Sequence, residues 1–281
     1  MVNYSYERND RAGYAATVNK LPISVCIISG AEAHRIGKCL ASVASWTSEL
    51  VVVLNPEVQD GTDAIVASFG AKIHRHPWQG FREQKNLALS YATLPWILSL
   101  DADEEVSGEL RESIARFFNG GQPRFAAARF ARKVWFLGRW ITHGDWYPDR
   151  VLRLFRRDSG KWAGTAEHCA VEAQGTCATL DGDLLHYTNP DISSYVNKIN
   201  YFADIYLQHQ LADKARWSAP AAVFRAGWRF VRSYFIRLGF LDGYPGFFIA
   251  ASTAYSTLVR HSRLFEHLQP RQPVCVPPKS P

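Results

Sequence analysis

The sequence lacks the cysteine patterns of a disulfide scaffold or of a thiolate zinc site. Its 281 residues include five cysteines, an odd number, and no two of them form a Cys-x-x-Cys pair. Small secreted domains carry even sets of paired cysteines, and zinc ribbons carry Cys-x-x-Cys pairs. We therefore expect free thiols and a reducing compartment.

Long hydrophobic runs are also missing. No stretch of about 18 residues, the length that a membrane-spanning helix needs, is free of charges and turn-forming residues. The opening MVNYSYERNDRAGY is polar and of mixed charge, unlike a signal peptide. Internal repeats and low-complexity tracts are absent, apart from a Pro-rich end at residues 269–281. We expect neither a spanning helix nor a signal peptide.

What is present is a large apolar fraction and a lopsided charge. With 47% hydrophobic and 21% charged residues, the chain has the composition of a globular protein and not of a disordered one. Residues 1–190 hold 21 basic and 21 acidic side chains, whereas residues 191–281 hold 11 and 5, so the net charge of +6 comes from the last third. A basic segment of this kind suits nucleic acid or an anionic membrane.

The first half of the chain alternates between strand and helix patterns. Short apolar runs such as ISVCII and LVVVL predict strands that are covered on both faces, and the segments between them carry apolar residues at helical spacing. This alternation predicts a doubly wound α/β sheet. The expected strands are residues 23–28, 50–54, 71–74 and 96–100, and the expected helices are residues 32–44, a segment starting at DGT (60–62), and 82–92.

Beyond residue 105 the pattern changes. A capping signature at Ser107 predicts a helix over 107–118, and strand-like runs at 125–130, 151–155 and 177–186 follow without crossover helices. They predict a mixed or antiparallel extension of the sheet. From residue 191 the pattern is helical. We therefore divide the chain into a polar leader (1–20), an α/β domain (21–190), a helical extension (191–268) and a flexible tail (269–281).

Two carboxylates follow the fourth predicted strand. The run WILSL-DADEE places Asp101 and Asp103 at its carboxyl end, where open α/β sheets bind their ligands. Paired carboxylates at this position suit a Mg²⁺ or Mn²⁺ ion that completes its shell with phosphate oxygens. The alternative is an acidic turn that leads into a helix. A phosphotransferase that uses an aspartate of DAD as nucleophile is a further alternative, although such a pair usually follows the first strand.

An ordered set of motifs resembles family 2 glycosyltransferases, which have the GT-A fold. ISVCIIS, LVVVLN, QKN and LDADEE appear in the order of that family, and FLGRWITHGDWYPDRVLRLFRR, LLHYTN and YFIRLGFLDGYPGFF resemble its lipopolysaccharide inner-core β-1,4-glucosyltransferases. The likeness covers residues 22–265. It implies an inverting, metal-assisted transfer of a hexose, glucose by this resemblance, from a UDP donor to a lipopolysaccharide-core or other lipid-linked glycan.

The resemblance also implies roles for individual residues. Asp101 and Asp103 match the pair that holds the metal on the donor diphosphate, and His186 matches a position facing that diphosphate. A solvated helix face is the alternative for Lys85. The positions that match the nucleotide-sugar site are Glu32, Asn55, Asp60, Lys85, Asn86 and Asp101.

The chain departs from the family in three places. Alanines at 31 and 33 flank Glu32, the second strand ends in Asn55 instead of an aspartate, and Cys169 stands where relatives carry a glutamate after histidine. An inverting transferase needs a general base at the acceptor hydroxyl, and cysteine is a poor one. These departures make a catalytically degenerate, glycan-binding relative the main alternative.

Three residues can replace the missing base. Glu167 is our first choice, because in an extended segment it points to the same side as Cys169. Asp145 and His168 are the others. Asp145 lies in an aromatic and polar segment suited to a sugar, so we expect His143, Trp146, Tyr147 and His168 to bind the acceptor. A structural aromatic loop is the alternative for this segment.

The helical extension carries an amphipathic stripe. Phe224, Trp228, Val231 and Phe235 recur at helical spacing, and Arg225, Arg229 and Arg232 form a second stripe beside them. This arrangement favours a helix in the interface of an anionic membrane, with packing against the α/β domain as the alternative. Nucleic acid is not expected, because the aromatic and basic residues are segregated. We expect a peripheral protein on the cytoplasmic face of the cytoplasmic membrane.

Overall fold

The computed structural model describes residues 20–119, 121, 123–165, 169–188, 191–212 and 217–269. The expected leader before Lys20, the expected tail after Gln269, and the two candidates Glu167 and His168 lie outside the described residues.

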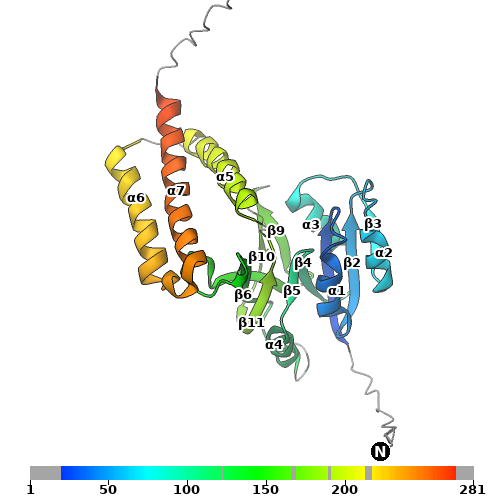
Figure 1. Cartoon of the computed structure of the whole chain (residues 1–281). Helices are drawn as coiled ribbons and strands as arrows, with labels where there is room; N and C mark the ends of the chain where they lie inside the picture. The colour runs from blue at the N-terminus through cyan, green and yellow to red at the C-terminus, as the bar shows by residue number, and fades with distance from the viewer. Residues whose placement is uncertain are drawn as a thin grey trace, which may run out of the picture.

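The first half of the chain forms the predicted doubly wound sheet (Figure 1). Its strands run parallel in the order β3-β2-β1-β4, with a helix in each crossover. The elements are β1 (Leu21–Ser29), α1 (Ile36–Ala44), β2 (Thr47–Leu54), α2 (Thr62–Ser68), β3 (Lys72–Arg75), α3 (Phe81–Ser90) and β4 (Trp96–Asp101). The predicted strands are confirmed, and all of them direct their carboxyl ends to one edge.

The second half extends the same sheet with strands of both directions. The order continues from β4 as β8-β6-β11-β5: β8 is antiparallel to β4 and β6, β6 is parallel to β11, and β5 is antiparallel to β11. The predicted mixed extension is confirmed. Its elements are β5 (Glu104–Val106), α4 (Gly108–Phe118), β6 (Ala127–Phe136), β7 (Arg139–Trp140), η1 (Gly144–Trp146), β8 (Asp149–Arg156), the hairpin β9 (Gly160–Gly164) and β10 (Cys169–Ala173), and β11 (Cys177–His186).

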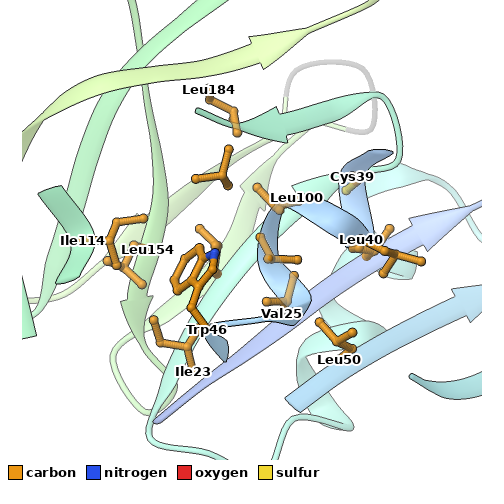
Figure 2. Close-up of a cluster of buried hydrophobic side chains, with 14 of the residues drawn as sticks. Ile23, Val25, Cys39, Leu40, Trp46, Leu50, Leu100, Ile114, Leu154 and Leu184 are labelled. Carbon is orange, nitrogen blue, oxygen red and sulfur yellow. The ribbon is translucent and has the colours of Figure 1, made fainter. Parts of the chain in front are cut away.

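The main core lies on one face of this sheet, under α1 and α4. Figure 2 shows Val25, Leu40 and Trp46 converging with side chains from β4, β8 and α4. Helix α1 begins at Ile36 and not at residue 32 as predicted. The physical reason is that the Thr62 hydroxyl accepts from the backbone N–H of residue 32, which holds the preceding turn in a loop.

Three long helices follow the sheet. Helix α5 (Ile192–Ala212) packs on α7 (Gly243–Leu268), and α6 (Ala219–Val231) packs on the other side of α7 (Figure 1). A π-helical turn η2 (Arg232–Ile236) and a 3₁₀ turn η3 (Gly239–Asp242) connect α6 to α7. A Cβ at Gly246 would lie 1.9 Å from the Gly239 carbonyl oxygen, so the connection requires glycine there. Among the described helices, none is both long and apolar enough to cross a membrane.

A buried carboxylate joins the strands at the edge of the sheet opposite the carboxyl ends. Glu49 of β2 accepts from Lys72 Nζ at 2.7 Å, from the Thr93 backbone N–H and hydroxyl at 2.8 Å each, and from the Ser24 hydroxyl. Burial by itself raises the pKa of Glu49, but these donors lower it to about 2. Glu49 therefore stabilises the folded chain in its ionised form.

The Glu49 contacts predict a defined pH dependence of stability. Because its folded pKa lies below the unfolded value, the contribution is complete above about pH 4.5 and is lost as the pH falls towards 2. Glu49→Gln should reduce the free energy of unfolding by up to about 3 kcal/mol at pH 7. In urea titrations from pH 7 to 3, the difference in free energy of unfolding between wild type and Glu49→Gln should become smaller as the pH falls. The exposed control Glu112→Gln should show no such difference at pH 7. A difference that stays constant with pH would contradict the role assigned to Glu49.

Candidate active site

A cleft of about 1370 Å³ opens where the parallel strands end. Its lining includes Ser29 at the end of β1, Asn55 after β2 and Asp101 at the end of β4, and it continues across β8 to Arg129 of β6. The strand order β2-β1-β4-β8-β6 therefore sets the order of side chains along the cleft. Ligands of doubly wound sheets bind at this edge.

Asp101 lies between two cations in the cleft. Its Oδ1 is 2.6 Å from Lys85 Nζ, and its Oδ2 is 2.8 Å from Arg153 Nη2. Burial raises the pKa of Asp101, but the charges of Lys85 and Arg153 more than offset this and hold it well below its usual range. Both cations lie over the Trp162 ring, at 4.1 Å and 4.9 Å from its centroid. The solvated-face alternative for Lys85 is therefore wrong, since the side chain is buried.

A β-bulge positions Arg153. In the ladder between β6 and β8, Ala128 pairs with Leu154 and Arg129 with Leu152, so Arg153 is the unpaired residue. Its guanidinium bonds Asp101 and the buried Glu104, both at 2.8 Å. Arg153 Nε and Nη1 are buried without a hydrogen-bond partner among the described residues. The sequence pattern assigned no role to Arg153; its only signal was a basic residue inside the apolar run predicted as a strand over 151–155.

Asp103 has a different environment from Asp101. Its Oδ2 lies 3.4 Å from His186 Nε2 and 3.7 Å from Arg35 Nη1. Burial raises the pKa of Asp103, whereas His186 and Arg35 lower it, and the net shift is downward. Arg35 also holds Glu32, so a chain of charged groups runs from the first loop to β11.

The donor set around Asp103 fits a divalent cation. Mg²⁺ is typically held by one or two carboxylates together with substrate phosphates and water. Asp103 and His186 both line the cleft and converge on each other, whereas both oxygens of Asp101 are already ion-paired. In the part of the chain that the structure describes, no group of three or more His, Cys, Asp or Glu is arranged around a metal. The chain therefore offers two ligands at Asp103 and His186, and a bound phosphate would have to supply more.

The nucleotide-sugar candidates divide into two groups. Glu32, Asn55 and Lys85 line the cleft together with Asp101. Asp60 does not: its carboxylate accepts from the backbone N–H groups of residues 33 and 62 and so positions the first loop. Asn86 does not line the cleft either, because its amide exchanges two 2.9 Å hydrogen bonds with the Trp162 backbone and positions that ring.

The segment from His143 to Tyr147 is not part of the cleft lining and anchors the helical extension instead. The Asp145 carboxylate, 8% exposed, lies 2.8 Å from Arg232, 3.5 Å from Arg229 and 3.6 Å from Arg237. Because three arginines contact this carboxylate outside the cleft lining, it is not positioned to reach an acceptor hydroxyl in the cleft. These contacts disfavour Asp145 as general base.

The three expected acceptor ligands of this segment have structural partners as well. The His143 backbone N–H donates to the fully buried Asp242 at 2.8 Å, and the Trp146 ring packs on Phe136 and Tyr195. The Tyr147 hydroxyl donates to Asp183 at 2.9 Å. Their contacts favour the alternative of a structural aromatic loop.

Several residues that line the cleft were not among the site residues predicted from the sequence. Asp149 lines the cleft at the start of β8 and bonds Arg132 at 2.7 Å. The exposed rings of Trp78 and Phe81 meet edge to face at 4.8 Å and offer apolar surfaces to a sugar or base. Cys169, in the expected position of the base, also lines the cleft.

The similarity of this chain to known proteins identifies its family. Residues 24–173, more than half of the chain, match the family described as Glycosyl transferase family 2. The chain is 30% identical over 258 residues to an uncharacterized glycosyltransferase of Rickettsia typhi, with 87% of each chain covered. It is 27% identical over 259 residues to the lipopolysaccharide core biosynthesis glycosyltransferase LpsC of Rhizobium meliloti, covering 87% of this chain and 95% of LpsC.

A solved structure with a similar arrangement is S. aureus TarS 1–349 in complex with UDP-GlcNAc. The TM-score is 0.45 at 14% identity, with 84% of this chain and 81% of that chain covered. The chain belongs to glycosyl transferase family 2. It is a glycosyltransferase with the mixed sheet of the GT-A fold, which confirms the resemblance seen in the sequence and excludes the phosphotransferase alternative.

Proposed function

We propose that this glycosyltransferase moves a hexose, with inversion, from a UDP donor to a lipopolysaccharide-core or similar lipid-linked glycan. The observation that carries the proposal is the charged centre at the end of β4, where Lys85, Arg153, Asp101 and Asp103 meet in the cleft. The motif resemblance supports glucose as the sugar, and the similarity to LpsC, a lipopolysaccharide core biosynthesis glycosyltransferase, supports the class of acceptor.

The buried cations suit the diphosphate of the donor. Asp101 and Glu104 balance the charges of Lys85 and Arg153, but the Nε and Nη1 atoms of Arg153 have no hydrogen-bond partner among the described residues. Charge-assisted hydrogen bonds to phosphate oxygens would satisfy them. Asn55, at the end of β2, is placed to bond a nucleobase edge.

Asp103 and His186 are the residues that would hold Mg²⁺ or Mn²⁺. When bound, the ion would offset the negative charge on the departing diphosphate. Arg35 Nη1 lies 3.7 Å from the same Asp103 oxygen that His186 contacts, which leaves Asp103 Oδ1 without an ion-pair partner among the described residues. Asp101 has another task, since it fixes the positions of the two cations.

Donor titrations distinguish these two aspartates. Calorimetry of the full chain with UDP should show at least tenfold tighter binding when Mn²⁺ is present, an order-of-magnitude expectation for one added charge contact. Asp103→Asn and His186→Gln should abolish the gain in UDP affinity caused by Mn²⁺ and keep the affinity measured without metal. Asp101→Asn should weaken UDP binding with and without Mn²⁺. The exposed control Asp181→Asn should behave as wild type.

Other outcomes of this titration would overturn parts of the proposal. An intact Mn²⁺ increment in Asp103→Asn would contradict the metal assignment. Failure of wild type to bind any UDP-sugar would contradict the proposal that the donor is a UDP-sugar. Binding without transfer or hydrolysis would favour the degenerate relative.

The acceptor hydroxyl needs a base on the side of the sugar away from the diphosphate. We keep Glu167 as the first choice, since Cys169, two residues later, lines the cleft. Asp149 is a second candidate. It lines the cleft, its ion-pair partner is Arg132, and it is not among the residues that contact Asp101 or Asp103. In either case the carboxylate would take the proton as the hydroxyl attacks the sugar.

Release of UDP from UDP-glucose, with rough lipopolysaccharide as acceptor, should identify the base. Glu167→Gln should lower kcat by about 10²–10⁴-fold with little change in donor KM, and should remove the acidic limb of the pH–rate profile. Cys169→Ser is the matched control and should stay within about twofold of wild type. If Asp149→Asn shows this loss and Glu167→Gln does not, the role belongs to Asp149.

We also propose that the helical extension docks on the cytoplasmic face of an anionic membrane. The stripe residues Phe224, Trp228, Val231 and Phe235 are 71%, 48%, 41% and 55% exposed, so the alternative of packing against the α/β domain is wrong for them. The connection to α7 continues this apolar surface. Its further exposed members are Ile236, Leu238, Phe240, Leu241, Tyr244 and Phe247.

Charge favours a bilayer over a second copy of the chain as the occupant of this surface. Residues 219–247 contain four arginines and a single acid, Asp242, which is fully buried. Three of these arginines share the one carboxylate of Asp145, so the segment keeps a net positive charge. In a symmetric dimer through this face, arginines of one copy would meet those of the other. Anionic headgroups would instead neutralise them while the aromatic side chains enter the interface.

Vesicle sedimentation of the full chain tests this docking. Binding should be stronger to phosphatidylcholine vesicles containing 30% phosphatidylglycerol than to phosphatidylcholine alone. Phe224→Ser/Trp228→Ser should reduce it at least tenfold through lost apolar burial, an order-of-magnitude expectation. Trp135→Ser, on the β6–β7 hairpin, is the control. Unchanged vesicle binding in the double variant, with a dimer converted to monomer, would assign the surface to a second copy.

A further inference from the structure

Two arginines at the β6 end of the cleft are not balanced by any carboxylate in the described part of the chain. Most of the other charged groups of the cleft have a partner of opposite charge: Arg35 with Glu32, Lys85 and Arg153 with Asp101 and Glu104, His186 with Asp103, and Arg132 with Asp149. Lys198, which also lines the cleft, donates to the Thr188 hydroxyl at 3.0 Å. Arg129 and Arg150 line the same cleft and are exposed. The described contact of Arg129 is a 3.0 Å hydrogen bond from its Nε to the Thr179 hydroxyl.

The sheet register puts these two arginines next to each other. Arg129 pairs with Leu152, and Ala131 pairs with Arg150, so Arg129 and Arg150 are diagonal neighbours on one face of the β6–β8 ladder. Diagonal neighbours lie about 7–8 Å apart, within reach of two long side chains, and like charges at such positions repel. An anion between the two guanidinium groups would remove the repulsion and satisfy both forks of donors.

Their place along the cleft points to the acceptor. Asn55 follows β2, the Asp101 centre follows β4, and β8 and β6 come next in the sheet. With strands about 4.8 Å apart, β6 lies about 19 Å from β2, on the far side of the diphosphate position from the nucleobase. A nucleotide sugar bound from Asn55 to Asp101 would thus present its sugar towards Arg129 and Arg150.

We propose that Arg129 and Arg150 bind an anionic group, a carboxylate or a phosphate, on the acceptor glycan. This inference rests on the proposed function and names the chemical class of its acceptor. The two arginines position the acceptor by its charge, so a neutral glycan of similar shape binds more weakly.

Ligand-observed NMR on the full chain, saturated with UDP so that the diphosphate position is filled, tests this. The probes are methyl glucoside, methyl glucuronide and glucose 6-phosphate. At low salt we expect wild type to bind at least one charged sugar about tenfold more tightly than the neutral one. Comparing methyl glucuronide with glucose 6-phosphate shows whether Arg129 and Arg150 prefer a carboxylate or a phosphate. Arg129→Gln/Arg150→Gln should reduce that preference to about twofold or less and leave UDP affinity unchanged.

A control variant separates this site from a general charge effect. Arg111→Gln/Arg124→Gln removes the same charge from exposed positions outside the cleft lining and should keep the wild-type preference. Equal binding of all three sugars to wild type, including no binding of any, would overturn the inference. So would a preference that survives in the cleft variant or disappears in the control. Loss of UDP binding by wild type would instead overturn the proposed function.

Discussion

Asp101 lies half-buried between the buried cations Lys85 and Arg153 where β4 ends, and both cations would be costly to bury without a carboxylate beside them. The three groups come from different parts of the chain: the end of a central strand, the crossover helix α3 and a bulge in β8. The Trp162 ring, itself held by the Asn86 amide, supports both cations. A sheet that did not bring β4, β8 and β9 together with α3 would leave a charge unpaired in its interior. The fold and the charged centre therefore depend on each other.

Buried carboxylates with polar partners also join the helical extension to the sheet. Asp145 neutralises arginines of α6, η2 and the residue after it, and Asp242 receives backbone N–H groups from the loop before η1. Two buried carboxylates thus hold the α6–α7 hairpin against the loop between β7 and β8. An apolar cluster of Phe136, Trp146 and Ile249 adds to this connection, whereas the apolar stripe of α6 takes no part in it and faces outward.

The cleft has a direction that follows from strand order. Amide and carboxylate groups of the first two strands come first, the Asp101 and Asp103 centre follows, and the arginines of β6 and β8 come last. A donor and an acceptor bound in this order would meet over the end of β4. Asp101 and Asp103 have different surroundings: Asp101 is ion-paired with Lys85 and Arg153, whereas Asp103 lies beside His186 and Arg35.

The sequence by itself determined the alternation of strands and helices, because strands covered on both faces need continuous apolar runs and amphipathic helices need apolar residues at helical spacing. It also placed Asp101 and Asp103 at the ligand-binding edge, since their position depends only on where one strand ends. Only the tertiary structure decided which partners each of the two aspartates has, that Arg153 completes the centre, and that Asp145 anchors helices instead of facing the cleft. Those outcomes depend on sheet register, on one bulge and on contacts between residues distant in the chain. Local pattern carries no information about such contacts, because the charge of a side chain does not say which distant partner the fold will bring to it.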